Sequence, residues 1–583
     1  MRNIRNWTEN WKQPLFDDGE KNLSLPIETP FADAPETLTL TREFRLPADE
    51  KASAFYLEIR ALSGRCRIEI DGAPVREFRS VFAPHITDVT AFIKKGEAQT
   101  LTLTITPEAR PDGLFILGGV SLIGTGLSHF ALSDEKAPLA VRTVFTDAGV
   151  TVRLHAEIEN PNNYDVLLFR LTSPEGILID VKSARPTDAN AAFDLPAPML
   201  WEGLHAAYLY KAEVLLQRDS EMIDMTQCAF GIRDFRAEPG GFFTLNGIKL
   251  PLNVLLLRGS GTAADIGCLT ALDANLAGLT SFSPDEDLLD RCDSLGILVF
   301  FKFPETGDDA DFEELAILTR LLARHPSAAF MAYESRDPAY GKKFCATVKN
   351  NAQYMYTVGG CDILEEDTLS DAIPDVLLLN YAVSPEKNGF TELQSRFEAV
   401  LEAHPNYRFA VFPKAPECFT DRHSVGAARP DCSQEYFSMW HARVWEIFST
   451  HKNTACYFTG FLSDESPKKD RSGLVTADRA EQKDAFWFYK SRFSAAPYCK
   501  LASLPASVTG KTVDVKCYTN ALRLKLLVNG KEKKRRLPVR LSENVYVFEK
   551  IKLKRKKNVI ELSCDNGADT TEVFRSKSRL SKK

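Results

Sequence analysis

The stretch Arg324–Asp337, RHPSAAFMAYESRD, joins a turn, a continuous apolar run and a charged cluster. His325 precedes Pro326, which disfavours helical backbone at His325, so a helix is expected to end there. Ala328–Tyr333 is apolar throughout, as in a strand covered on both faces. The run then breaks into Glu-Ser-Arg-Asp, and an α/β barrel carries its functional side chains at the carboxyl ends of such strands.

The region around this stretch, Phe242–Phe493, alternates short apolar runs with amphipathic segments of helical period. Helices are expected near Cys268–Leu276, Phe312–Ala323, Thr391–His404 and Gln434–Ser449. Strands that alternate with helices form parallel sheets. About 250 residues of this pattern are the size of a (β/α)8 TIM barrel, which we expect at residues 239–498.

The flanking regions alternate apolar and polar residues with period two, which predicts antiparallel β-domains. The clearest examples are Thr37–Leu46, Cys66–Val75, Val150–Glu159 and Asn558–Cys564. We expect one β-sandwich at residues 1–130, a second at 131–238 and a third at 499–570. A basic tail is expected at residues 571–583.

The composition is that of an ordinary globular protein, with 44% hydrophobic residues, 26% charged residues and a net charge of −7. The twelve cysteines include no C-x-x-C pair and no cluster with histidine at zinc spacing. We therefore expect free thiols, no metal site and no cofactor. The start of the chain has no apolar signal-peptide core, and no apolar stretch approaches about 20 residues. These patterns predict a cytoplasmic protein with no membrane partner.

Five segments resemble, in order, the motifs of glycoside hydrolase family 2, the family of β-galactosidases and β-glucuronidases. They are Leu288–Phe301, Arg324–Ser327, Pro374–Tyr381, Tyr457–Phe461 and Ser472–Phe493. The resemblance implies an N-terminal jelly-roll sandwich, an immunoglobulin-like sandwich, the TIM barrel and a C-terminal immunoglobulin-like domain. It also implies the family's reaction, the retaining hydrolysis of terminal β-linked sugars by two carboxyl groups.

The two positions that carry those carboxyl groups in the family hold other residues here. The acid/base is expected after the Arg-His-Pro-Ser strand, where the ungapped match is Arg336. A two-residue deletion would bring Glu334 there instead. The nucleophile is expected after Arg408–Phe412, where the match is Pro413, which has no carboxyl group. Glu417 lies four residues later.

Other pocket positions of the family also differ. Where relatives carry hydrogen-bonding, charged or indole side chains, this chain has Leu257, Leu279, Phe282, Lys302 and Phe458. Asn380 and Tyr381 match the family at the end of the sixth strand. A buried carboxylate without its partners is costly, so apolar replacements are the expected result once catalysis is lost.

The first functional hypothesis is therefore a non-catalytic carbohydrate-binding or scaffold protein. Its ligand contacts would come from Asn380, Tyr381, Phe458, Lys302 and Arg336. Asn can bridge sugar hydroxyls, and an aromatic ring packs on a pyranose face. Two cations at former carboxylate positions would favour an acidic sugar.

The second hypothesis is an active β-glycosidase whose carboxylates have moved. Glu334 would then be the acid/base and Glu417 the nucleophile, or Asp464 and Glu465 after the eighth strand would contribute. The lone histidines His325 and His423 are expected to be structural.

The end of the chain is strongly basic. Residues 511–583 hold 21 Lys and Arg against 8 Asp and Glu, a net +13, which leaves −20 for residues 1–510. One interpretation is solvated strand faces followed by a basic tail. The other is an electrostatic docking surface for an acidic partner, although no nucleic acid is expected.

Overall fold

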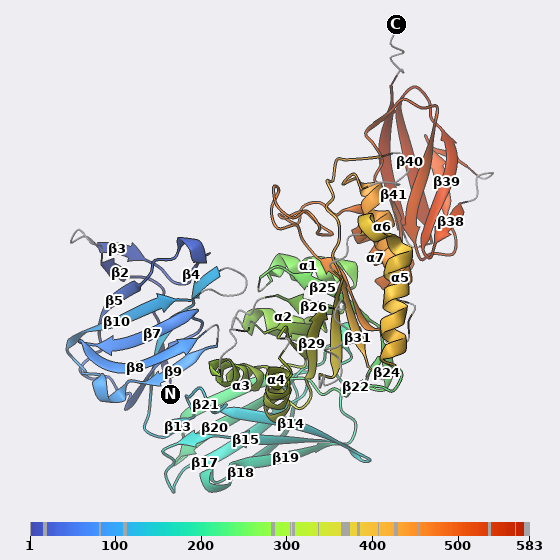
Figure 1. Ribbon diagram of the computed structural model, residues 1–583. Coiled ribbons are helices and arrows are strands. Elements are labelled where there is room, and N and C mark those ends of the chain that lie inside the picture. Colours follow the sequence, from blue (N-terminus) through green and yellow to red (C-terminus); the bar gives the residue numbers. More distant parts are fainter. Residues whose placement is uncertain are drawn as a thin grey trace.

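A computed structural model of the chain shows a closed eight-stranded barrel with β-sandwiches before and after it (Figure 1). The structure describes residues 2–14, 20–80, 83–108, 114–259, 261–280, 286–303, 305, 309–335, 337–362, 374–381, 385–405, 407–424, 430–449, 451, 454–533, 538–565 and 567–576. Among these residues, no helix is both long and apolar enough to cross a membrane.

The barrel is made of parallel strands in sequence order, closed by pairing of the first strand with the last. Its strands are β25 (Leu252–Leu257), β26 (Leu276–Leu279), β27 (Leu298–Lys302), β28 (Ala328–Tyr333), β29 (Tyr356–Asp362), β30 (Val376–Tyr381), β31 (Phe409–Pro413) and β32 (Thr454–Phe461). Its helices are α1 (Ala263–Leu272), α2 (Glu286–Leu295), α3 (Ala310–Leu322), α4 (Pro338–Asn351), α5 (Pro385–Ala403), α6 (Gln434–Phe448) and α7 (Asp484–Phe493). The predicted TIM barrel is confirmed, including the helix that ends before His325 and the strand at Ala328–Tyr333.

Successive residues of each barrel strand face opposite sides. Leu256, Phe300 and Phe458 belong to the cluster that fills the lumen. Their neighbours Leu257, Phe301 and Tyr457 belong to a separate cluster that packs against the helices. This alternation tells which residue at each strand end points toward the mouth of the barrel.

A small antiparallel sheet adds its aromatic residues to the lumen cluster from the amino ends of the strands. Its strands are β22 (Phe235–Ala237), β23 (Phe243–Leu245) and β24 (Ile248–Leu250). Phe243 is fully buried, stacks on Phe235 at 5.1 Å and meets the Phe330 ring edge-on at 5.3 Å. These rings close that end of the lumen.

The N-terminal domain is a sandwich with a four-stranded and a six-stranded sheet and a short ribbon. Its strands are β1 (Asn3–Asn6), β2 (Trp11–Pro14), β3 (Glu20–Leu23), β4 (Ile27–Pro30), β5 (Leu38–Arg45), β6 (Ala54–Ile59), β7 (Gly64–Ile70), β8 (Ala73–Ser80), β9 (His85–Asp88), β10 (Ala98–Pro107), β11 (Leu114–Leu117) and β12 (Val120–Thr125). Fully buried Trp11, Leu40 and Leu103 lie in one core between the sheets, which is the expected result of period-two patterning.

The immunoglobulin-like domain follows and packs on the amino end of the barrel (Figure 1). Its strands are β13 (His129–Phe130), β14 (Leu139–Thr146), β15 (Gly149–Ala156), β16 (Ile158–Glu159), β17 (Val166–Thr172), β18 (Leu178–Ala184), β19 (Asn190–Leu195), β20 (Tyr210–Arg218) and β21 (Glu221–Phe230). Fully buried Trp201 donates its indole N–H to the carbonyl of Asp293 at 2.8 Å. A Cβ added to Gly296 would lie 2.0 Å from the carbonyl oxygen of Gly203, so the two domains are in direct backbone contact.

The C-terminal domain is a third sandwich, made of a four-stranded and a five-stranded sheet. Its strands are β33 (Cys499–Leu501), β34 (Ser507–Val508), β35 (Thr512–Thr519), β36 (Lys525–Val528), β37 (Lys531–Glu532), β38 (Val539–Ser542), β39 (Val545–Lys552), β40 (Lys556–Cys564) and β41 (Gly567–Arg575). Strand β41 continues past the expected boundary at residue 570, because its backbone stays paired with β40 as far as Arg575. The expected tail therefore begins later than residue 571.

Helix α7 closes the barrel and supports this last domain. The sequence pattern predicts a structural role for its aromatic residues, and Phe486, Phe488 and Tyr489 are all buried. The Phe488 ring meets Tyr518 of β35 edge-on at 6.4 Å. These contacts give the aromatic residues of α7 the structural role that the pattern predicts.

Candidate functional site

The mouth of the barrel, where the strands end at their carboxyl termini, is the candidate site. On the lumen-facing side of the strands, β25 leads to Arg258, β27 ends at Lys302, and β28 leads to Glu334. Strand β32 ends at the half-buried Phe461, which packs against the lumen cluster. The mouth thus combines two cations, a carboxylate and an aromatic ring.

Lys302 and Glu334 form an ion pair across neighbouring strands, with 2.8 Å between Nζ and Oε1. The Glu334 side chain is 54% exposed and that of Lys302 is 32% exposed. An ion pair in contact with water contributes only about 0–1 kcal/mol, so either partner can exchange for a ligand. Arg336, the ungapped match to the acid/base position, lies outside the described residues.

Glu305 lies beside this pair and was not singled out from the sequence. Its Oε1 accepts the backbone N–H groups of Glu334 and of Ser335, the latter at 3.1 Å. Burial raises the pKa of Glu305, the two backbone hydrogen bonds offset part of the rise, and the charge of Glu334 adds to it. Glu305 follows strand β27 within an irregular segment, where no periodic pattern could have identified it.

The position expected for a nucleophile contains no carboxylate. Ala410 and Phe412 of β31 belong to the lumen cluster, whereas Pro413 is buried at the strand end and pairs in register with Tyr381. Glu417 lies in the following loop, is exposed and forms no ion pair within the described part of the chain. Glu417 thus takes no part in the ion pair of Lys302 and Glu334.

Phe458 was predicted as an aromatic platform for a sugar, and its position in the structure contradicts this. Its side chain is only 1% exposed and meets the Phe300 ring edge-on at 5.2 Å, inside the lumen. Phe461 occupies the mouth instead, because the strand is irregular near Gly460, whose φ is +111°. A stretch of sequence alone gives no sign of this shift.

Leu257 and Leu279, which match two pocket positions of the family in sequence, do not face the lumen. Both are buried in the layer between strands and helices, because the alternation turns them away from the lumen. The residue that follows Leu257, Arg258, reaches the mouth. Phe282 lies outside the described residues, as do the side chains of Asn380 and Tyr381, whose backbone forms the end of β30.

Arg258 is held in place by groups of the loop after β32. Its guanidinium lies 4.1 Å from the centre of the Phe461 ring, and its Nη2 is 2.8 Å from Oδ2 of Asp470. Burial acts to raise the pKa of Asp470, but hydrogen bonds from Ser472 and Arg258 outweigh it and leave the pKa below its usual value. Arg258 thus places a fixed positive charge at the mouth, and its guanidinium covers the ring of Phe461.

Asp464, a candidate carboxylate of the second hypothesis, is buried and has a structural role. Its Oδ1 lies 2.7 Å from Nζ of Lys483 and accepts the backbone N–H of Gly473 at 2.9 Å. Burial raises the pKa of Asp464, an effect that Lys483 only partly offsets. Glu465 is more exposed and forms an ion pair with Lys469 at 2.5 Å.

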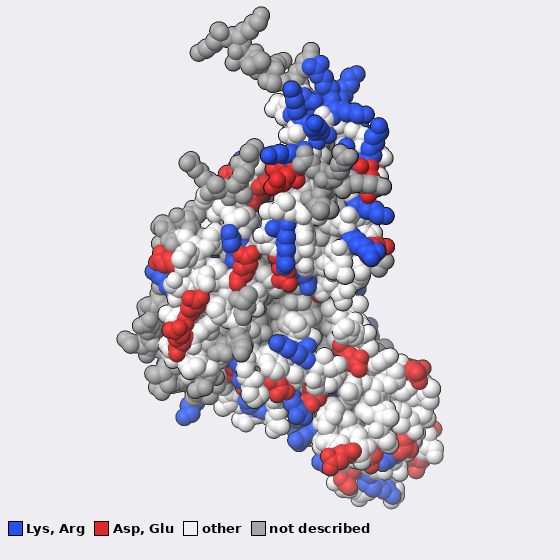
Figure 2. All heavy atoms as spheres, turned by 90° about the vertical axis from the view of Figure 1, so that its right-hand side faces the viewer, with Lys and Arg blue, Asp and Glu red and all other residues white. Residues whose placement is uncertain are grey.

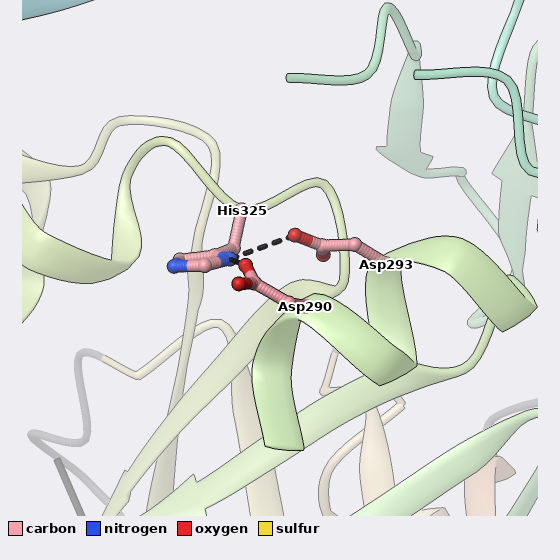
Figure 3. Close-up of side chains that lie close together, drawn as sticks. All are labelled: Asp290, Asp293 and His325. Carbon is pink, nitrogen blue, oxygen red and sulfur yellow. Dashed lines mark hydrogen bonds and ion pairs between the residues drawn. The ribbon is translucent and has the colours of Figure 1, made fainter. Parts of the chain in front are cut away.

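Asp290, Asp293 and His325 form the one group of three possible metal ligands among the described residues (Figure 3). Nδ1 of His325 lies 2.7 Å from Oδ2 of Asp293 and 3.9 Å from Oδ1 of Asp290. The other Asp293 oxygen accepts the backbone N–H of Ser327 at 2.9 Å. These bonds tie the turn before β28 to α2 at the amino end of the barrel, which is a structural role.

His423 has a similar role. Its Nδ1 lies 2.9 Å from Oε1 of Glu435 in the first turn of α6. The hydrogen bond with Glu435 raises the pKa of His423, against the effect of burial. Both histidines that the sequence suggested as structural are paired with carboxylates.

No family model matches the chain, but curated relatives resemble it over part or most of its length. A β-glucuronidase of Bacteroides fragilis is 21% identical over 570 residues, which covers 82% of this chain and 79% of that protein. A β-galactosidase of Thermoanaerobacter pseudethanolicus is 24% identical over 302 residues, or 45% of this chain and 39% of that protein.

Solved structures share the fold. An FMN-binding β-glucuronidase from Facaelibacterium prausnitzii L2-6 superposes with a TM-score of 0.85 at 20% identity, covering 100% of this chain and 99% of its own. A β-glucuronidase from Ruminococcus gnavus in complex with D-glucuronic acid gives a TM-score of 0.71 at 16% identity, covering 85% of this chain and 98% of its own. The jelly-roll, immunoglobulin-like and barrel order predicted from the sequence is therefore confirmed.

Proposed function

Because the chain is a divergent glycoside hydrolase family 2-like protein, we propose that it binds a carbohydrate at the mouth of its barrel without hydrolysing it. A retaining glycosidase needs two carboxyl groups about 5–5.5 Å apart. The observation that carries the proposal is the end of β31, where Phe412 faces the lumen and Pro413 follows it. Glu334 is paired with Lys302, and Glu417 is exposed in a loop.

The ligand that fits the mouth best is an acidic monosaccharide such as a uronate. Lys302 can exchange the exposed Glu334 for a ligand carboxylate, and Arg258 follows β25 at the same carboxyl end of the barrel. The backbone of Asn380 and Tyr381 ends on the same rim, and their side chains with that of Arg336 complete the proposed contacts. Phe461 takes the aromatic role that the sequence gave to Phe458.

Isothermal titration with D-glucuronate, D-galactose and D-glucose tests this proposal. We expect heat with glucuronate, and at least a fivefold weaker affinity in Lys302→Met. Lys343→Met, on α4, is the matched control. Lys343 is likewise a surface lysine in an ion pair, and its Nζ lies 2.6 Å from Oδ1 of Asp309. No heat with any of the sugars would refute carbohydrate binding and leave a scaffold role for the flanking domains.

A hydrolase with relocated carboxylates is the second candidate function. The observation in its favour is Glu305, a half-buried carboxyl with a raised pKa beside Glu334, as a general acid requires. Glu417 remains the other candidate. Turnover of aryl β-glucuronides or β-galactosides that is abolished in Glu334→Gln, Glu305→Gln or Glu417→Gln would establish this function and exclude the first.

A cytoplasmic location belongs to the same proposal. The eleven cysteines whose side chains the structure describes are all free thiols. Burial raises the pKa of Cys66 and of Cys456 to about 12, which suppresses the reactive thiolate. Such thiols are usual in a reducing compartment. Mass spectrometry of alkylated protein taken directly from cells would test whether they stay reduced.

A further inference from the structure

One end of the C-terminal domain carries a dense group of cations around the connection between β39 and β40. We call it the basic turn, and it consists of Lys511, Lys552, Lys554, Arg555, Lys556, Lys557 and Arg575. The backbone N–H of Leu553 donates to the carbonyl of Lys511 at 3.0 Å, and Arg575 Nη1 donates to the carbonyl of Leu553 at 3.0 Å. These bonds bring three separate segments together. Figure 2 shows Lys and Arg side chains gathered over this domain.

The basic turn is rigid because a buried asparagine organises its backbone. Oδ1 of Asn558 accepts the backbone N–H of Lys554 at 2.8 Å, and its Nδ2 donates to the carbonyl of Lys554 at 2.9 Å and to that of Lys556 at 3.2 Å. Asn529 donates to the same Oδ1 at 3.0 Å. The side chains of Lys554, Arg555 and Lys556 are exposed on this fixed loop.

The charges of the basic turn are largely uncompensated by the protein itself. Among the described residues, Lys557 alone of the seven forms an ion pair, with Glu572. Lys556 stands directly opposite Arg575 across the ladder, and like charges in that arrangement are destabilising. Lys556 also has a φ of +75°, a region that side chains other than glycine rarely occupy. Six of the seven cations thus form no ion pair that would stabilise the fold within the described residues, which indicates a role in binding.

An exposed aromatic ring lies beside the basic turn. Phe574 is 48% exposed and stands opposite Lys557 in the ladder. The apolar face of a pyranose packs against such a ring, while cations beside it pair with anionic groups. A chain of sugars that carry carboxylates or sulfates offers both features at every repeat.

We propose that the basic turn is a docking surface for a linear acidic polysaccharide. The choice of a polysaccharide over other polyanions rests on the proposed function of the barrel in binding carbohydrate. The surface would hold the polymer while the mouth of the barrel takes a single sugar unit. Bound counterions are released when several cations meet a polyanion, so the affinity falls steeply with salt.

Titration of the full chain with polygalacturonate, with neutral dextran as comparison, tests the proposal. We expect binding of polygalacturonate alone, weakened at least tenfold in the triple variant Lys554→Glu, Arg555→Glu, Lys556→Glu. The matched control is Lys51→Glu, Arg142→Glu, Arg153→Glu, three exposed cations of the first two domains that give the same change in net charge. The control should bind within twofold of the unmodified chain. Phe574→Ala should weaken binding roughly two- to tenfold, the loss expected for one ring contact.

Several results would overturn the proposal. An equal loss in the control triple would show that bulk charge, not the basic turn, attracts the polymer. Tighter binding of duplex DNA or of phosphatidylglycerol vesicles than of polygalacturonate at the same salt concentration would assign the surface to another partner. The two proposals are separated by their ligands: the glucuronate titration reports on the barrel, whereas the difference between the two triple variants in polygalacturonate binding reports on the basic turn.

Discussion

Lys483 and Asp464 form an ion pair that is almost wholly shielded from water, with 2.7 Å between Nζ and Oδ1 and side-chain exposures of 0% and 6%. The same ammonium group donates to the carbonyl of Arg471 at 2.7 Å. The pair therefore joins the loop after β32 to the start of α7, and it fixes the last turn of the barrel.

Removal of one partner of this pair should destabilise the protein strongly. Lys483→Met leaves the Asp464 carboxyl buried without a cation, which costs about 3–5 kcal/mol. We expect a clear fall in the unfolding temperature and faster amide exchange over residues 462–483. The double variant Lys483→Met, Asp464→Asn should lose less than the two single variants combined. Glu481→Gln, an exposed change nearby, serves as the control, and an equal loss there would contradict this account.

His441 should make stability depend on pH. Burial lowers the pKa of His441 to about 3, with a smaller contribution from the charge of Lys483. In the unfolded chain, histidine has a pKa of about 6.5. Between about pH 6.5 and pH 3 the unfolded state therefore binds a proton at His441 that the folded state does not bind. Stability should fall as the pH falls through this window, by up to about 1.4 kcal/mol per pH unit.

The variant His441→Gln should show a flatter dependence of the unfolding temperature on pH below 6.5. Nδ1 of His441 lies 2.9 Å from the Tyr489 hydroxyl, and glutamine can keep a polar group there. His205→Gln, on an exposed histidine, should leave the pH profile unchanged. A profile that is identical in the unmodified protein and in His441→Gln would refute the assignment.

Phe488→Ala should open a cavity between α7 and the C-terminal domain. The ring is fully buried, and Arg492 lies 3.6 Å from its centre. Truncation of a buried phenylalanine costs about 3–5 kcal/mol. Leu522→Ala should change the unfolding temperature little, because Leu522 is 99% exposed. Calorimetry of both variants provides the measurement, and a similar effect in the two would be inconsistent with the packing described.

Gly296→Ala should weaken the contact between the immunoglobulin-like domain and the barrel. The φ of Gly296 is +74°, and an added Cβ would lie 2.0 Å from the carbonyl oxygen of Gly203. Gly267 lies in α1 with open space around it, so Gly267→Ala should be neutral or stabilising by about 0.4–1 kcal/mol. Limited proteolysis should detect separation of the domains only in Gly296→Ala.

The sequence was sufficient for the order of domains and for the barrel. Period-two and helical patterns are physical consequences of burying one face, so they predict strands and helices directly. The stretch Arg324–Asp337 correctly predicted that α3 ends before His325 and that β28 follows. Glu334 comes directly after that strand.

The side chains at the mouth were harder to predict, because a shift of one residue exchanges the two faces of a strand. Leu257 matched a pocket position in sequence, yet Arg258 faces the lumen. The irregularity near Gly460 places Phe461 where Phe458 was expected. Glu305 lies in a segment without periodicity. Its position beside Glu334 depends on tertiary contacts, such as its hydrogen bond from the backbone N–H of Ser335.

The rings that close the amino end of the lumen have a consequence for the order of folding. Trp201, Phe235 and Phe243 precede every barrel strand in the chain, yet they share one cluster with lumen residues of β28 and β32. During synthesis they leave the ribosome first, and domains generally fold from the N-terminus onward. The barrel strands would then assemble against apolar side chains that are already folded, those of Trp201, Phe235 and Phe243. A fragment that starts at Leu252 would lack these side chains, and the apolar residues at the amino end of its lumen would be exposed to water.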